Sequence, residues 1–72
     1  KKKFLNQIVE VLFENKMKDQ NKYFGRDKFL NSVIVESEKD LTGQILSVRI
    51  NSLNQKSLFG NILSNEKNFY AA

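Results

Sequence analysis

Residues 44–51 have the sequence QILSVRIN, and from residue 46 onward apolar and polar side chains alternate. In an extended chain successive side chains point to opposite faces, so the apolar set shares one face and the polar set the other. These sets are Leu46, Val48 and Ile50 against Ser47, Arg49 and Asn51. A period of two with β-branched residues predicts a half-buried β-strand rather than a helix.

The same period recurs in four other short stretches. They are residues 7–14, 22–26, 31–36 and 57–63. The side chains expected to point inward are Val9, Val11, Phe13, Val33, Val35, Leu58 and Ile62. Polar segments separate the strands and predict turns. Gly25 and Gly60 interrupt two of them, which indicates a bulge or a close approach of neighbouring backbone.

A chain of 72 residues without proline is one small domain. Five short strands predict an all-β fold, a small five-stranded antiparallel OB-like barrel, since closure removes the unpaired edges of an open sheet. An SH3-like barrel is the alternative. The expected organisation is a linker or lead-in at 1–6, the barrel at 7–64 and a flexible tail at 65–72. The chain starts with lysine rather than methionine, and we expect it to be a piece of a longer protein.

Cysteine, histidine and tryptophan are absent. Their absence excludes disulfides, thiolate or imidazole metal sites, iron–sulfur ligation and histidine-dependent nucleophilic catalysis within this chain. The carboxylates have no accompanying base or metal cluster, so we expect no catalytic residues here. No long apolar run is present, which predicts no membrane span and a cytoplasmic location.

Positive charge is concentrated in the first half of the chain. Residues 1–30 contain eight Lys/Arg and four Asp/Glu, giving 8 − 4 = +4, whereas residues 31–72 contain four of each, giving zero. Clustered lysines and arginines favour a polyanionic partner, because phosphates release counterions when such clusters bind them. An ordinary solvated surface would carry the same charge.

Three stretches, taken in order, resemble the TRAM domain, an OB-like RNA-binding module of RNA-modifying enzymes. The first is residues 9–14, with the sequence VEVLFE. The second is Gly25-Arg26 followed by Asn31 and Val33. The third runs from DLTGQ at 40–44 through VRI at 48–50 to SLFG at 57–60. The match covers residues 7–63 and is most similar to the C-terminal TRAM domain of MiaB-type tRNA methylthiotransferases.

The resemblance implies a module that helps to hold the tRNA anticodon stem-loop. The chemistry would lie in the catalytic domains of a radical-SAM parent enzyme, with iron–sulfur clusters and S-adenosylmethionine. The implied partners are tRNA and those catalytic domains, and the fragment is expected to be monomeric without a membrane partner.

Basic and aromatic residues are the candidates for RNA contact, through phosphate pairing and base stacking. The set is Lys22, Tyr23, Phe24, Arg26, Lys28, Phe29, Arg49 and Lys56. Arg26 is the leading candidate, with an ion pair to Asp27 or Glu14 as the alternative. Tyr23 and Phe24 are neighbours, so they face opposite ways and at most one is fully in the core.

Two other functions remain open from the sequence. One is a structural or protein-interaction barrel that packs on its parent enzyme, which predicts an exposed apolar patch involving Leu30, Phe59 and Leu63. The other is an OB-type domain of a translation or ribosome factor, which would lack the glycine–arginine and serine–leucine–x–glycine pattern.

Overall fold

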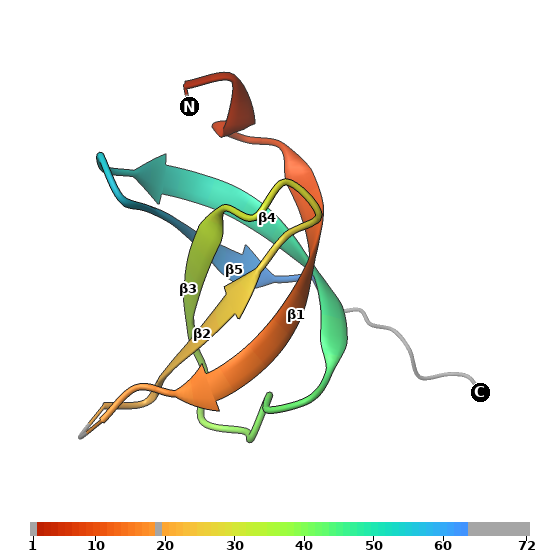
Figure 1. The fold of residues 1–72 in the computed structure, drawn as a ribbon, viewed down its shortest axis with the longest axis vertical. Helices are drawn as coiled ribbons and strands as arrows, with labels where there is room; N and C mark the ends of the chain where they lie inside the picture. The colour runs from red at the N-terminus through yellow and green to blue at the C-terminus, as the bar shows by residue number, and fades with distance from the viewer. Residues whose placement is uncertain (1, 19, 64–72) are drawn as a thin grey trace.

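Five strands close into a barrel in the computed structural model, which describes residues 2–18 and 20–63 (Figure 1). The elements are η1 (Lys2–Phe4), β1 (Ile8–Lys16), β2 (Lys22–Arg26), β3 (Ser32–Glu36), β4 (Ile45–Leu53) and β5 (Ser57–Ile62). The all-β barrel expected from the sequence is confirmed. The tail expected at 65–72 lies outside the described residues, and residues 2–4 of the expected lead-in form the 3₁₀ turn η1.

The strands follow one another around the barrel in the order β1-β2-β3-β5-β4, and β4 pairs with β1 to close it. Four of the five pairings are antiparallel, but β3 and β5 are parallel. The expected five-stranded antiparallel barrel is thus confirmed, with one parallel seam between β3 and β5. The reason is geometric, because strand directions cannot alternate all the way around a closed ring with an odd number of members.

The core is built from the inward faces of all five strands. Its buried side chains are Val11, Phe13, Tyr23, Val33, Val35, Leu41, Val48, Ile50 and Leu58. Val9, Leu46 and Ile62 are partly buried and pack against this cluster. The inward positions predicted from the period of two are thus confirmed, and the alternation determines which side chains each strand turns outward.

The two strand glycines mark the places where the barrel bends most tightly. A Cβ on Gly25 would lie 2.5 Å from the backbone oxygen of Leu12, and one on Gly60 would collide with the backbone oxygen of Arg49. Each glycine also lies beside a register shift on its partner strand, in β1 after Phe13 and in β4 after Ile50. Bulges increase local twist, and the missing Cβ lets the opposing backbone follow that twist.

Candidate nucleic-acid interface

The outer side of β2 presents basic and aromatic side chains in one column. Lys22, Phe24 and Arg26 point outward, because Tyr23 and Gly25 between them are buried. Phe24 lies opposite Ile34 across the β2–β3 seam, and Ile34 lies opposite Phe59 across the β3–β5 seam. All three are half-buried. The barrel therefore carries a row of partly exposed apolar side chains flanked by cations, which we call the β2 face and define as Lys22, Phe24, Arg26, Ile34 and Phe59.

Arg26 is held in place by two neighbours. Its Nε lies 3.6 Å from Glu14 Oε2, and its guanidinium carbon lies 5.3 Å from the centroid of the Phe24 ring. The ion pair with Glu14 that the sequence allowed as an alternative is therefore present. About half of the arginine side chain is exposed (46%), so the guanidinium still has donors that face solvent.

Tyr23 is a correction to the candidate set. Its side chain is only 5% exposed and belongs to the hydrophobic core. A buried ring offers no face to a base, so Tyr23 cannot be a stacking platform. The alternation at residues 23 and 24 placed one ring inside and one outside, and Phe24 is the outer one.

Lys28 and Phe29 lie in the β2–β3 loop, beyond the end of the β2 column. The Phe29 ring is 60% exposed and packs against Phe4 of η1, with ring centroids 5.8 Å apart. Lys28 Nζ lies 5.3 Å from the centroid of Phe29, and Lys3 Nζ lies 5.7 Å from that of Phe4. The pairing of Phe29 with Phe4 was missed, because the sequence assigned residues 1–6 to a linker.

Asp27 organises this loop from inside. The carboxylate is almost fully buried. Its Oδ1 accepts hydrogen bonds from the backbone amides of Phe29 and Asn31, both 2.9 Å long. Its Oδ2 accepts a third, from Asn31 Nδ2 at 2.9 Å. The side chains of Asp27 and Asn31 together fix the loop that carries Lys28 and Phe29.

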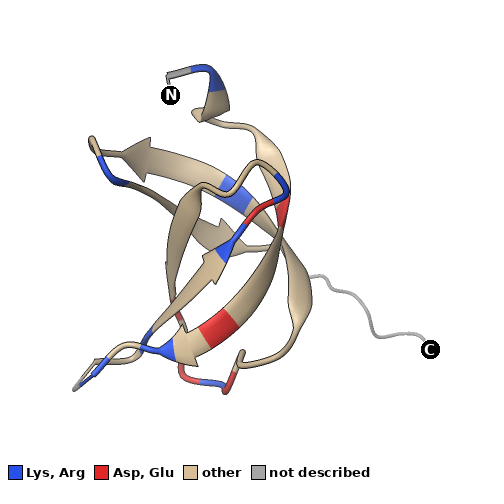
Figure 2. Cartoon of the chain, in the orientation of Figure 1, with Lys and Arg blue, Asp and Glu red and all other residues tan. Residues whose placement is uncertain are grey.

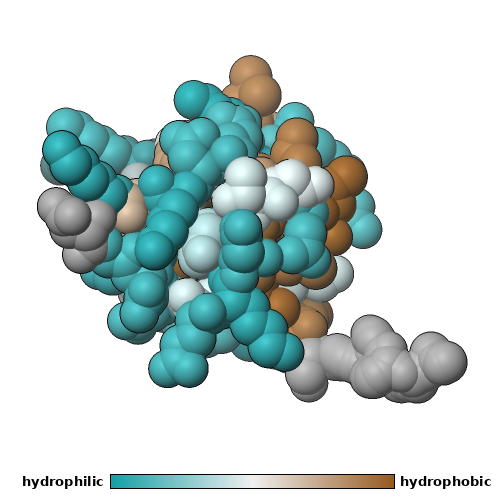
Figure 3. All heavy atoms as spheres, turned by 90° about the horizontal axis from the view of Figure 1, so that it is seen from below, coloured by the Kyte–Doolittle hydropathy of each residue, from teal (hydrophilic) through white to brown (hydrophobic). Residues whose placement is uncertain are grey.

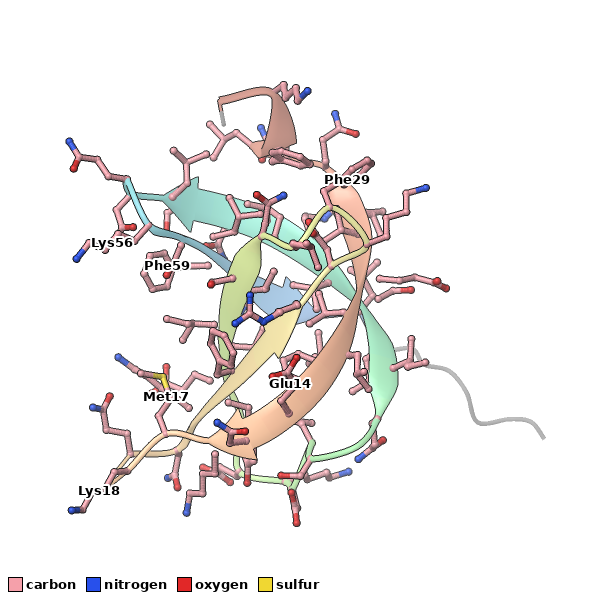
Figure 4. The ribbon with its side chains drawn as sticks, in the orientation of Figure 1. Glu14, Met17, Lys18, Phe29, Lys56 and Phe59 are labelled. Carbon is pink, nitrogen blue, oxygen red and sulfur yellow. The ribbon has the colours of Figure 1, made fainter. Side chains whose placement is uncertain are left out.

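The last two candidates come from β4 and from the loop that follows it. Arg49 is exposed on β4 and lies between Ile8 of β1 and Asn61 of β5. Lys56 follows Asn54, whose Oδ1 accepts hydrogen bonds from the backbone amides of residues 56 and 57, both 2.8 Å long. Figure 4 shows Lys56 and Phe59 on the same side of the barrel as Met17 and Lys18 of the β1–β2 turn.

Charge is distributed unevenly over the described residues. Figure 2 shows lysines and arginines at the β1–β2 turn, in the β4–β5 loop and along β2, with acidic residues on β1 and in the β3–β4 connection. Within residues 2–18 and 20–63, Arg26–Glu14 is the one ion pair closer than 4.0 Å. Lys22, Lys28 and Lys56 consequently have no carboxylate partner at that distance within the described part of the chain.

An exposed apolar strip borders the β2 face, because Leu12 lies opposite Arg26 across the β1–β2 seam. Leu12 and Ile45 are paired across the β1–β4 seam and are 45% and 65% exposed. Ile8, on the same outer face of β1, is also exposed. In Figure 3 hydrophobic side chains gather on the right-hand side, where β1 and β4 lie in Figure 1, and hydrophilic ones cover most of the remaining surface in view. Of the three residues expected in an apolar patch, Leu30 is exposed, whereas Phe59 and Leu63 are half-buried.

The structure places no metal-binding cluster of three acidic, cysteine or histidine side chains in the part of the chain that it describes. That part also contains no helix with the length and apolar character needed to cross a bilayer. Among the same residues, the one clear pKa shift is at Asp40, which is not part of the β2 face. Hydrogen bonds from Thr42 hold the pKa of Asp40 below its ordinary value of 3.8, and the Thr42 backbone amide donates one of them at 2.9 Å.

No protein-family model matches the chain. Curated relatives do match, and three of them share the name tRNA-2-methylthio-N(6)-dimethylallyladenosine synthase. The protein from Pelagibacter ubique is 45% identical over 62 residues, which is 86% of this chain and 14% of that protein. The one from Acetivibrio thermocellus is 39% identical over 61 residues, 83% of this chain and 13% of that protein. The one from Orientia tsutsugamushi is 35% identical over 65 residues, 88% of this chain and 14% of that protein. The chain is therefore homologous to one short segment of the tRNA-2-methylthio-N(6)-dimethylallyladenosine synthases, about a seventh of the length of these relatives.

Proposed function

We propose that the chain is a TRAM-like RNA-binding module of a tRNA methylthiotransferase and that it binds the tRNA anticodon stem-loop. The observation that carries the proposal is the β2 face, where Lys22 and Arg26 flank the outward ring of Phe24. The second strand and the β1–β2 and β4–β5 loops are the parts that OB-like barrels use for oligonucleotides. Here those two loops contribute Lys18 and Lys56.

Binding would combine phosphate neutralisation with limited stacking. Lysine ammonium groups and the solvent-facing donors of Arg26 pair with phosphates, and the exposed parts of Phe24 and Phe59 contact bases or sugars. With a few phosphate contacts the isolated chain should bind on the order of ten to hundreds of micromolar. Attachment to a larger RNA-binding enzyme raises the effective concentration and makes such weak contacts useful.

The catalytic chemistry belongs to other parts of the proposed parent enzyme. Its relatives are named for methylthiolation of dimethylallyladenosine in tRNA. Iron–sulfur clusters need thiolate ligands, and this chain has neither cysteine nor histidine, so its residues do not fit such a cluster. We assign the clusters and S-adenosylmethionine to the parent's catalytic domains, and we place that enzyme in the cytoplasm.

An NMR titration of the labelled 72-residue chain with an anticodon stem-loop tests the proposal. We expect shifts at residues 22–26, Lys56 and Phe59 that weaken as salt increases, because counterion release drives the binding. An Arg26→Ala variant should bind more weakly. Lys39→Ala, which removes an exposed lysine from the β3–β4 connection, should bind as tightly as the unsubstituted chain. Absence of shifts at low salt with millimolar RNA would contradict the proposal.

A second candidate function is packing on the catalytic domains of the parent enzyme. The exposed pair of Leu12 and Ile45 favours it, because neighbouring large apolar side chains on a small domain mark protein contacts. Leu12 lies opposite Arg26 across the β1–β2 seam, so this pair adjoins the β2 face and extends away from it toward Ile45. An excess of the separately expressed catalytic part should shift the NMR signals of Leu12 and Ile45 if the second function holds.

A further inference from the structure

A pocket of about 530 Å³ opens at the end of the barrel between η1, the start of β1 and the β2–β3 loop. Phe4 and Phe29 form its aromatic wall, Ile8 and Val9 its apolar floor, and Lys3 and Lys28 contribute its cations. The volume falls within the range of small-molecule sites. The residues of the β2 face take no part in its lining, so this is a separate feature of the molecule.

The wall of the pocket is fixed before any ligand arrives. Asp27 is committed to three hydrogen bonds within the β2–β3 loop, and they hold the segment that carries Phe29. Leu30 has a φ of 66°, a conformation that costs a leucine free energy, and its side chain is exposed. The loop thus maintains a strained backbone and an exposed phenylalanine ring. Such strain is typical of a functional site rather than a plain connection.

The charges of the pocket favour a nucleotide over an apolar protein segment. Each phenylalanine ring has a lysine ammonium near its centroid, Lys3 at Phe4 and Lys28 at Phe29. An apolar segment that covered the rings would take two lysine ammonium groups and the Glu10 carboxylate out of water, which is costly. A nucleotide supplies a flat base for a ring and a phosphate for an ammonium group together. Glu10, also in the lining, can accept a hydrogen bond from an exocyclic amino group of the base.

We propose that this pocket holds one unpaired nucleotide of the bound RNA, with the base against Phe29 and the phosphate at Lys28 and Lys3. The inference rests on the proposed RNA-binding function and adds to it a preference for single-stranded over duplex RNA. The β2 face acts mainly through phosphates, which both forms carry, whereas the pocket requires a base that is free to leave its stack.

The absence of tryptophan from the chain allows a direct test. A Phe29→Trp variant keeps an aromatic wall and introduces a single indole whose fluorescence reports on stacking. We expect saturable quenching by single-stranded hexaadenylate and none by a blunt RNA duplex. A further Lys28→Gln change should weaken the quenching titration, whereas Lys39→Gln should leave it unchanged. In the otherwise unaltered chain, Phe29→Ala should lower affinity for hexaadenylate about five-fold or more, the effect expected from losing one stacked base.

The outcomes separate the pocket from the β2 face. Ile45→Ala is the matched control for Phe29→Ala, since it also removes an exposed apolar side chain but lies outside the pocket. One result would overturn the pocket proposal and leave the RNA-binding function standing. In that result RNA shifts the NMR signals of the β2 face, but the indole fluorescence does not change and Phe29→Ala binds hexaadenylate as tightly as the unsubstituted chain. If neither single-stranded RNA, duplex RNA nor the anticodon stem-loop binds the unsubstituted chain, both proposals fail.

Discussion

The Asp27 carboxylate accepts two hydrogen bonds of 2.9 Å from Asn31, one at each oxygen, across the loop between β2 and β3. The backbone amide of Asn31 donates the first and its side-chain amide donates the second. This nearly buried carboxylate is tolerated because both of its oxygens accept hydrogen bonds, and all of the donors lie within the same loop. The pair therefore determines the shape of the loop that carries Phe29.

Removing this carboxylate should destabilise the barrel. We expect Asp27→Ala to lower the free energy of unfolding by about 1–3 kcal/mol, because buried amides lose a charged acceptor. Asp27→Asn should cost less, since an amide oxygen can still accept the bonds made by Oδ1. Urea denaturation followed by circular dichroism measures both values. Equal stability of Asp27→Ala and the exposed-site control Glu38→Ala would contradict the role given to Asp27.

The two glycines Gly60 and Gly43 should respond differently to alanine. At Gly60 a methyl group collides with the backbone of Arg49, so Gly60→Ala should prevent tight closure of the β4–β5 seam and leave the chain largely unfolded. At Gly43 nothing lies within 4 Å of the added Cβ, and only the φ of 81° opposes alanine. That conformation should cost about 1–2 kcal/mol. Thermal melts of both variants measure the two losses of stability. Similar losses for Gly60→Ala and Gly43→Ala would contradict this prediction.

Neutralising Glu14 should strengthen RNA binding with little effect on stability. The Arg26–Glu14 pair is exposed, and such pairs contribute about 0–1 kcal/mol. In Glu14→Gln the guanidinium loses its competing carboxylate and becomes fully available to phosphate. We expect tighter binding of the anticodon stem-loop by Glu14→Gln and weaker binding by Arg26→Ala, both measured by NMR titration. Unchanged affinity in both variants would show that Arg26 does not contact the RNA.

Asp40 should titrate below its ordinary pKa of 3.8, because hydrogen bonds from Thr42 stabilise the ionised form. A pKa that is lower in the folded state than in the unfolded state stabilises the fold above the unfolded value. That contribution is lost as pH falls through the folded value. The carboxyl carbon of Asp40, followed by NMR between neutral and acidic pH, reports the midpoint. Thr42→Ala should raise the midpoint, and Thr42→Ser, which keeps the hydroxyl group, should leave it low.

The sequence predicted the inward faces of the strands better than the strand ends. The bounds of β2 were predicted at residues 22–26, as the structure has them. β1 continues to Lys16 and β4 to Leu53, beyond the predicted 14 and 51. Both strands pass a register shift near these ends, and the shift interrupts the period of two from which the predictions were made.

Within the site, local spacing could identify residue types but not their neighbours. The alternation showed that Tyr23 and Phe24 face opposite ways, but only the closed barrel determines which ring is inside. Phe4 and Phe29 are 25 positions apart (29 − 4 = 25), so no local pattern connects them. Five strands in a closed ring require at least one parallel pair, but only the strand order of the barrel places it between β3 and β5.

Closure of the barrel through β1 and β4 also has consequences for how the chain folds. Ile8 pairs with Arg49, a separation of 41 positions (49 − 8 = 41). Contacts between residues so distant in sequence slow folding, and small β-barrels of this kind fold in roughly milliseconds to seconds. During synthesis on the ribosome, one edge of β1 has no strand to pair with until β4 has emerged. The nascent chain is therefore most open to edge-to-edge aggregation from the completion of β1 until all of β4, which ends at Leu53, has emerged.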